Sequence, residues 1–161
     1  MKLLLCAVYL AFTGMLGFLL GRWIPKGRLK PEEGLFRCFE FEKNGAVYEK
    51  LGIRKWQNRL PDMSRIFPSM MPAKNLSGDF EKRLPVMILE TCVAEITHGL
   101  LCVVGLGCIW ICPGWGGLAA ALIDIVLLNL PFILIQRYNR PRLLHLQQKL
   151  REREGGAPCV Y

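Results

Sequence analysis

Residues 96–135 read ITHGLLCVVGLGCIWICPGWGGLAAALIDIVLLNLPFILI. The two ends of this stretch are apolar runs, and the uncharged sequence CPGWGG, residues 112–117, separates them. About 20 apolar residues in a helix are enough to cross the roughly 30 Å hydrocarbon core of a bilayer. The first run reaches that length once the preceding, more polar residues are included. The stretch therefore predicts a hairpin of two membrane helices, over 85–112 and 117–136.

A third uncharged run, residues 3–20, stands near the start of the chain and predicts a membrane helix over 3–21. Arg22, Lys26 and Arg28 follow it closely, and no small-x-small cleavage site precedes them. A membrane anchor is therefore the favoured interpretation, and a cleaved signal peptide is the weaker alternative. At 161 residues, the chain is expected to form a single all-α integral membrane domain of about three transmembrane helices, an anchor and a helical hairpin.

The basic residues are distributed unevenly along the chain. Of the 21 Lys and Arg residues, 20 lie in just two segments, 22–83 and 137–161, and the formal net charge is +8. Because basic segments remain on the cytoplasmic side of a membrane, both segments are predicted to be cytoplasmic, with the N-terminus outside. The chain is thus predicted to be a multi-pass protein of the cell membrane. This distribution accounts for the positive charge, so bilayer phosphates and not nucleic acid are the expected anionic partners.

The cytoplasmic segment 22–83 is predicted to be partly ordered. Residues 35–41 alternate apolar and polar side chains, which indicates a short strand or an interfacial segment. Residues 47–56 mix basic and apolar side chains at helical spacing, which is typical of a helix lying among lipid headgroups. We expect Lys55 and Trp56 to dock this part on the bilayer. Pro61, Pro68 and Pro72 predict irregular structure in the rest of the segment.

The segment after the third helix is predicted to begin with a break. Pro141 removes a backbone donor, so we expect the membrane helix to end there. A separate basic helix is predicted from Leu143 onward, within the tail 137–161.

Ionisable side chains inside a membrane are costly and suggest function. His98 lies about 8 Å inside the hydrocarbon, if about 20 residues are counted back from Cys112. Glu95 shares its helix face, and Glu90 lies within reach. An imidazole can take a proton from a hydroxyl near neutral pH, and Glu95 could orient it. The alternative is that the two side chains only join neighbouring helices.

The third predicted helix adds polar residues at the same end of the hairpin. Asn129, Gln136 and Arg140 follow at spacings of seven and four residues, which places them on one face. Arg137 and Arg142 leave the membrane at the same level. Arginine clusters bind phosphates, so a nucleotide-bearing donor such as acyl-CoA fits these residues, as do lipid headgroups.

Metal chemistry is not indicated. Glu95-Ile96-Thr97-His98 has the Glu-x-x-His form of di-iron proteins, but no second such motif occurs in the sequence. We therefore expect no metal site and no bound cofactor. The seven cysteines include no Cys-x-x-Cys pair, which argues against a disulfide framework.

Several sequence blocks resemble the glycosyl-4,4'-diaponeurosporenoate acyltransferase family over residues 39–143. The blocks, in chain order, are 39–45 (FEFEKNG), 53–56 (IRKW), 60–62 (LPD), 88–91 (ILET), 94–98 (AEITH), 129–131 (NLP) and 136–143 (QRYNRPRL). The family positions correspond to Glu90, Glu95, His98 and the run from Gln136 to Arg142, which adds Asn139 to the candidate binding residues.

The resemblance implies an enzyme that moves a fatty acyl chain to a sugar hydroxyl of a membrane-bound glycosyl carotenoid or another glycolipid. The donor is expected to be acyl-CoA or acyl carrier protein. Two other functions are consistent with the residues: a non-catalytic glycolipid-binding membrane subunit, and a lipid hydrolase or phosphotransferase. So short a membrane enzyme is compatible with a homo-oligomer that encloses its site.

Overall fold

A computed structural model of the protein describes residues 1–60 and 80–155. Within these ranges the fold is all-α and contains no strand. The elements that make up the three long helical spans are α1 (Lys2–Gly21), α5 (Phe80–Gly105), α6 (Cys108–Ile111), α7 (Trp115–Ile123), the π-helical turn η5 (Asp124–Asn129) and α8 (Leu130–Gly155). The short elements between α1 and α5 are η1 (Lys26–Arg28), η2 (Gly34–Phe36), η3 (Glu40–Gly45), α2 (Ala46–Lys50), α3 (Ile53–Trp56) and η4 (Gln57–Arg59).

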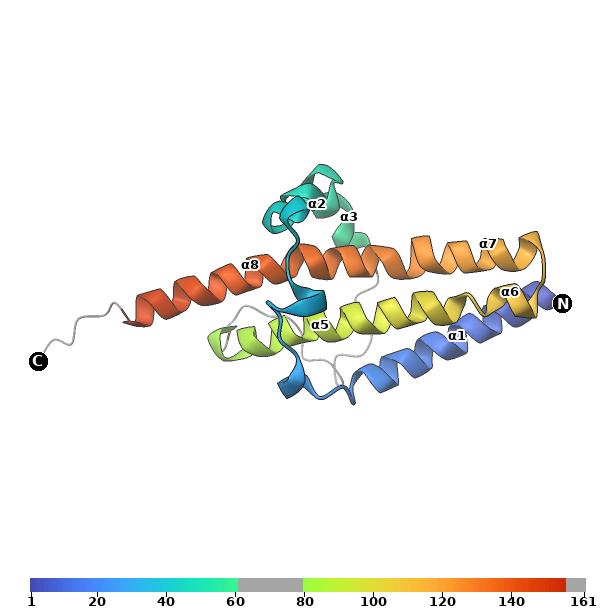
Figure 1. Cartoon of the computed structure of the whole chain (residues 1–161), viewed down its shortest axis with the longest axis horizontal. Helices are drawn as coiled ribbons and strands as arrows, with labels where there is room; N and C mark the ends of the chain where they lie inside the picture. The colour runs from blue at the N-terminus through green and yellow to red at the C-terminus, as the bar shows by residue number, and fades with distance from the viewer. Residues whose placement is uncertain (61–79, 156–161) are drawn as a thin grey trace, which may run out of the picture.

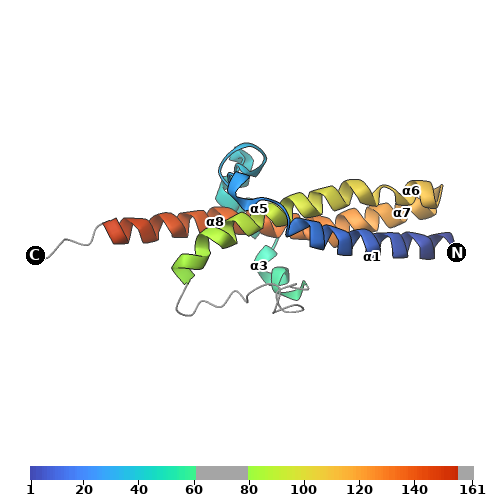
Figure 2. The ribbon, with the colours of Figure 1, turned by 90° about the horizontal axis from the view of Figure 1, so that it is seen from below.

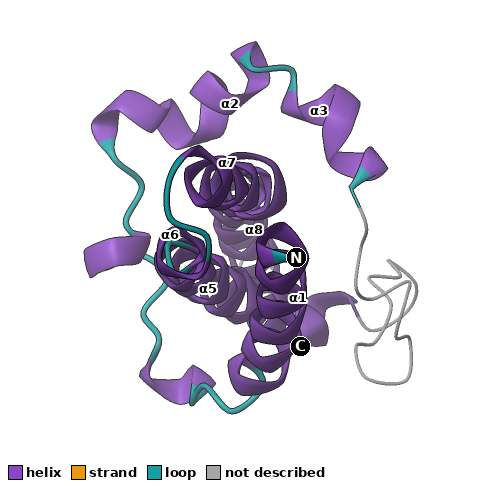
Figure 3. Cartoon of the chain, turned by 90° about the vertical axis from the view of Figure 1, so that its right-hand side faces the viewer, coloured by secondary structure: helices purple, strands orange, loops and turns teal. Residues whose placement is uncertain are grey.

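In the described part of the chain, three helices are long and apolar enough to cross a membrane: Lys2–Gly21, Phe80–Ile111 and Trp115–Arg153. They lie side by side, with the N-terminus and the α6–α7 turn at one end (Figures 1 and 3). We call the opposite end, where α1 ends and residues 22–60 lie, the basic end of the bundle. The predicted fold class, an all-α membrane protein with an anchor and a helical hairpin, is confirmed.

The hairpin turn depends on glycine at two points. Gly114 has a φ of +97°, a backbone conformation that residues with a Cβ rarely adopt. A Cβ at Gly117 would collide with the backbone carbonyl oxygens of Cys108 and Cys112. Glycine therefore lets the chain reverse sharply and lets α7 begin close against α6.

The outer faces of the helices are apolar along their length. Leu4 and Phe12 of α1 and Leu127 of η5 are exposed, as expected of side chains that contact lipid. Three tryptophans are exposed near the ends of the helices, at positions typical of the interfacial layers of a bilayer: Trp23, Trp110 and Trp115. Apolar side chains along the helices and tryptophans near their ends are thus the pattern expected of a bundle that spans a bilayer.

The third span is not uniformly α-helical. Its turn η5 is wider than an α-helical turn, and the side-chain amide of Asn129 donates to the backbone carbonyl of Asp124 across it (3.1 Å). Pro131 is the second residue of α8 and has no N–H to donate to the preceding turn. Such π turns occur often at functional sites, and here both Asp124 and Asn129 are buried.

The prediction that a helix ends at Pro141 is wrong. α8 continues through Pro141 to Gly155, so the tail is an extension of the third span. Proline removes one backbone hydrogen bond and crowds the carbonyl of the preceding turn, a cost that tertiary packing can offset. Because Tyr138 and Arg140 are almost completely buried against other elements, their packing keeps the helix intact at this position.

The chain between α1 and α5 packs on the bundle. Residues 29–45, which we call the crossing segment, run across α5 and α8 to reach α2 (Figures 1 and 2). They form short 3-10 turns and not the strand that their alternating sequence allowed. Pro61, Pro68 and Pro72, which were predicted to lie in irregular structure, fall outside the described residues.

The short helices α2 and α3 lie against α8, on the side away from α5 (Figure 1). Their contact with α8 is formed by the buried side chains of Tyr48, Ile53 and Tyr138. The Tyr138 hydroxyl accepts a hydrogen bond from Arg54 (2.9 Å) and donates one to Glu49 (3.2 Å). The basic end of the bundle is therefore a packed structure in which loop and helix share a core.

Candidate functional site

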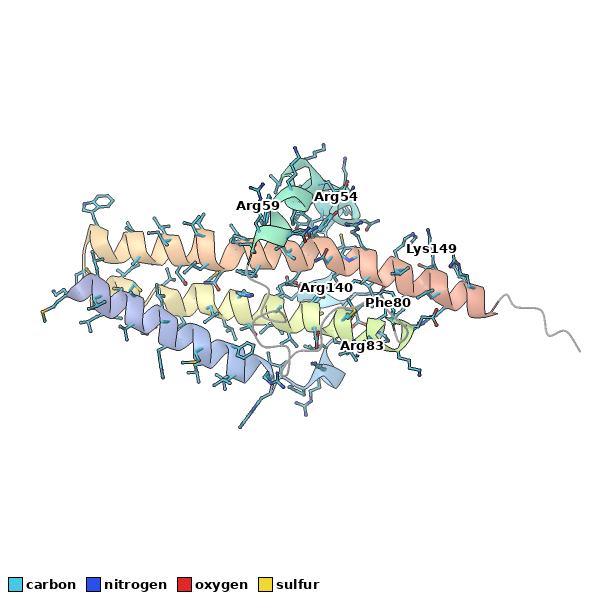
Figure 4. The ribbon with its side chains drawn as sticks, turned by 180° about the vertical axis from the view of Figure 1, so that it is seen from behind. Arg54, Arg59, Phe80, Arg83, Arg140 and Lys149 are labelled. Carbon is cyan, nitrogen blue, oxygen red and sulfur yellow. The ribbon has the colours of Figure 1, made fainter. Side chains whose placement is uncertain are left out.

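Arg140 is the largest fully buried side chain in the described part of the protein (Figure 4). It extends from α8 to Thr91 of α5, donating to the hydroxyl (2.9 Å) and to the backbone carbonyl (3.3 Å). A third bond goes to the backbone carbonyl of Phe36 in the crossing segment (3.0 Å), and the guanidinium lies over the Phe36 ring. Arg140 therefore joins α5, α8 and the crossing segment.

Arg137 lies one turn earlier on α8 and is only 11% exposed. Its guanidinium donates to Glu42 through Nε (2.5 Å) and Nη2 (2.9 Å), a forked geometry that suits a carboxylate. It also donates to the backbone carbonyls of Leu35 (3.2 Å) and Arg37 (3.1 Å). Glu42 and Arg137 thus fasten the crossing segment to α8.

Glu95 completes this network. One carboxylate oxygen accepts from Arg137 (2.6 Å) and the other accepts from Arg140. Two guanidinium groups and two carboxylates, those of Glu42 and Glu95, thereby neutralise one another in a buried position. We call these four residues, Arg137, Arg140, Glu42 and Glu95, the charge network.

The protonation of Glu42 reflects its surroundings. Burial alone would raise the pKa of this carboxyl, but hydrogen bonds from Arg137, Tyr48 and the Phe39 backbone outweigh that effect and lower the pKa to about 2. Burial and the hydrogen bond to Glu42 raise the pKa of the Tyr48 hydroxyl to about 12. At neutral pH, the ionised carboxylate therefore accepts a hydrogen bond from the neutral phenol.

His98 lies one turn further into the bundle than Glu95. Its Nδ1 is 3.0 Å from Oδ1 of Asn129, and its ring stacks on Phe132 with the centroids 4.7 Å apart. Glu95 was expected to orient His98. In the structure, both Glu95 oxygens instead accept hydrogen bonds from arginines. Asn129 is the residue that hydrogen-bonds to the imidazole.

The arginines were also expected to bind donor phosphates, but two of the three are already engaged within the protein. Arg137 and Arg140 are engaged by carboxylates and backbone carbonyls, so their charges are already balanced. Arg142 is exposed; its guanidinium lies over the Tyr138 ring, 4.8 Å from the centroid, and donates to the Tyr138 hydroxyl. Among the three predicted arginines, Arg142 is the one whose charge meets solvent.

The other predicted residues lie at the same end of the bundle but apart from His98. Glu90 pairs with Lys26 (3.3 Å), near the end of α1. Lys55 is exposed, whereas Trp56 packs against the cluster of Tyr48, Ile53 and Tyr138. Gln136 and Asn139 are half-buried on α8.

Sequence reasoning missed several contributors to this region. Glu42 and Tyr48 were not singled out, although Glu42 lies within a block that resembles the family. Thr91 appeared only as part of the block 88–91, and here its hydroxyl accepts a hydrogen bond from Arg140. The block 39–45 (FEFEKNG) is the sequence signal from which Glu42 could have been found.

The arrangement can support proton transfer close to a buried, electrically balanced network. No group of three or more His, Cys, Asp or Glu side chains is placed to hold a metal ion among residues 1–60 and 80–155. The chemical elements present are an imidazole inside the membrane span, an amide that fixes it and a rigid ion-pair cluster one turn away. Such a site suits acid–base chemistry on a lipid-borne group.

Comparison with known proteins gives the family. A family model described as glycosyl-4,4'-diaponeurosporenoate acyltransferase matches residues 32–149, which include the charge network, His98 and Asn129. Proteins of that name from Staphylococcus aureus strains bovine RF122 / ET3-1, N315 and MRSA252 are each 28% identical to this chain over 156 residues, covering 92% of it and 89% of the relative. No solved structure matches. The chain belongs to the glycosyl-4,4'-diaponeurosporenoate acyltransferase family.

Proposed function

We propose that this acyltransferase transfers a fatty acyl group to a sugar hydroxyl of a glycosylated carotenoid or a closely similar glycolipid, with His98 as the general base. The observation that carries the proposal is the position of His98. Its imidazole lies in a membrane span, stacked on Phe132 and hydrogen-bonded to Asn129. The names of the family and of its relatives supply the acceptor class.

The proposed reaction is a direct transfer. His98 takes the proton of the acceptor hydroxyl as the hydroxyl oxygen attacks the thioester carbonyl of the donor. The new ester C–O bond forms, the C–S bond breaks, and the proton passes from the imidazolium to the departing thiolate. The products are the acylated glycolipid and a free thiol, so no further reactant is needed.

The donor is proposed to be acyl-CoA or acyl carrier protein, approaching from the basic end of the bundle. Because Glu42 and Glu95 balance the charges of Arg137 and Arg140, we assign donor phosphates to the exposed cations Arg142 and Lys55. The charge network then holds the crossing segment in place beside the site. With the basic end on the cytoplasmic side, a cytosolic donor and a membrane-bound acceptor can meet at His98.

The test is transfer of labelled acyl groups from acyl-CoA or acyl carrier protein to a glycosylated carotenoid by the purified protein in detergent. Wild type is compared with His98→Ala and with His145→Ala, in which the substituted histidine is an exposed residue of the α8 extension. We expect transfer by wild type and His145→Ala and loss of at least about 100-fold with His98→Ala. Glycolipid binding without transfer by the wild type would instead indicate a non-catalytic subunit.

A further inference from the structure

Asn129 makes two hydrogen bonds whose directions can be worked out. Its side chain lies 3.1 Å from the backbone carbonyl oxygen of Asp124 and 3.0 Å from Nδ1 of His98. The side chain is buried, in the π-helical turn η5, and it connects the third span to α5. Residues 98 and 129 are 31 positions apart, so this contact exists only when the hairpin is closed.

The chemistry of the three groups allows a single arrangement of protons for a neutral histidine. A backbone carbonyl can only accept, so the Asn129 atom that faces Asp124 must be the amide nitrogen. The amide oxygen then faces His98 and can only accept in turn. Nδ1 of His98 must therefore carry the proton, and the lone pair of the neutral ring is left on Nε2.

The surroundings make this arrangement rigid. Asn129 is held by the turn η5, and Pro131, two residues further on, restricts the backbone of the first turn of α8. The His98 ring is held as well, because it stacks on Phe132 with an interplanar angle of 6°. The ring is thus clamped at one nitrogen and over one face.

From this geometry we infer that Asn129 is a positioning residue that selects the Nδ1–H tautomer of His98 and so leaves Nε2 free as the proton acceptor. The catalytic consequence rests on the proposed function, whereas the tautomer itself does not. The role differs from donor or acceptor binding, which was the expectation for Asn129 from sequence. An asparagine can do this without adding charge inside the membrane span, unlike the aspartate that orients histidine in many hydrolases.

The tautomer can be measured directly because the chain has only two histidines. The full-length protein, with His145→Gln to remove the second signal, is labelled with 15N-histidine and studied by NMR in detergent at pH about 9, where an ordinary imidazole is neutral. We expect the proton on Nδ1 in this background. Asn129→Leu, which has a similar size and no acceptor, is expected to give a mixture of tautomers.

A second variant keeps the test valid if Asn129→Leu disturbs packing. Asn129→Asp retains an acceptor oxygen and is expected to keep the proton on Nδ1. Gln148→Leu, at an exposed position on α8, is the matched control and should leave the spectrum unchanged. A proton on Nε2 in the His145→Gln background, or the same tautomer in Asn129→Leu and the background, would overturn the inference.

Kinetics separate this inference from the proposed function. With transfer established, Asn129→Leu is expected to lower kcat by about tenfold or more while KM for the acceptor changes little. An unchanged kcat in a variant with an altered tautomer would refute the positioning role. If no variant and no wild type transfers acyl groups, but the tautomers are as expected, the proposed function fails while the assignment of Asn129 as the tautomer-setting residue stands.

Discussion

Arg137 of α8 and Glu42 of the crossing segment form a forked ion pair, although they are 95 positions apart in the chain. Arg137 is 11% exposed and Glu42 is 2% exposed, so the pair is shielded from water. Glu95 and Arg140 share the same network and bring its net charge to zero. The stability of the basic end therefore depends on all four charges being present together.

Removing one carboxylate from the charge network should destabilise the protein strongly. Glu42→Gln or Glu95→Gln leaves two buried guanidinium groups with a single carboxylate between them, and one unbalanced buried charge typically costs about 3–5 kcal/mol. The check is the apparent melting temperature in detergent, followed by tryptophan fluorescence. Glu33→Gln, which removes an exposed pair with Lys30, is the control and should have little effect. Equal melting temperatures for all three variants and wild type would contradict the prediction.

Stability should fall in acid because of Glu42. Its pKa is about 2 in the folded protein and 4.5 ordinarily, so the folded state favours the ionised carboxylate. This contribution, on the order of 3 kcal/mol, is present above pH 4.5 and is lost as the pH falls towards 2. As the pH falls across this range, the free energy of unfolding should decrease less steeply for Glu42→Gln than for wild type. Parallel curves would refute the assignment.

Gly45→Ala should weaken the attachment of the crossing segment to α8. Gly45 has a φ of +93°, and a Cβ there would lie 3.3 Å from the carbonyl oxygen of Tyr138. Gly34 has a φ of +57° with no atom within 4 Å of the corresponding position. Gly34→Ala should therefore cost about 1 kcal/mol from backbone strain alone, and Gly45→Ala about 1 kcal/mol more. The comparison of melting temperatures is decisive, since equal losses would exclude the tight contact.

Arg142→Gln should weaken the use of donors that carry phosphates. We expect KM for acyl-CoA to rise about 10-fold, with kcat little changed, because an exposed charge contributes mainly to binding. A short acyl thioester of N-acetylcysteamine, which lacks phosphate, should be used equally by the variant and wild type. Lys149→Gln, two turns further along α8, is the matched control (Figure 4). A similar loss with both donors would mean that Arg142 does not bind phosphate.

The basic end should lie in the cytoplasm. Green fluorescent protein fused after Tyr161 should fluoresce, and alkaline phosphatase fused at the same point should be inactive, because phosphatase needs an oxidising compartment. Phosphatase inserted after Gly114, in the α6–α7 turn, should be active. The reverse pattern would place the N-terminus inside and would separate His98 from a cytosolic donor.

The membrane helices could be predicted from the sequence because each is encoded by consecutive apolar residues. Hydropathy and helix length require no knowledge of distant contacts, and they led to the correct fold class. The path of α8 through Pro141 could not be predicted in this way. It depends on the burial of Tyr138 and Arg140 against the crossing segment and α5, which is a tertiary effect that overrides the local preference of proline.

The candidate site was predictable only in part, for a related reason. Helix periodicity places His98 and Glu95 on one face, but it does not say which partner each side chain takes. Glu95 lies between two guanidinium groups, and the amide of Asn129 reaches His98 because of the register of the hairpin. Glu42 carries no periodic signal at all, since its position is set by the route of an irregular segment.

The route of the crossing segment also constrains how the protein can be made. Glu42 leaves the ribosome 95 residues before Arg137, which at about 5–20 residues per second is roughly 5–20 s earlier. During that interval Arg137 has not yet been made, so the carboxylate lacks its native partner and the segment must stay hydrated at the membrane surface. The network can close only after the last helix has been inserted, so biogenesis of this protein ends with the step that assembles its basic end.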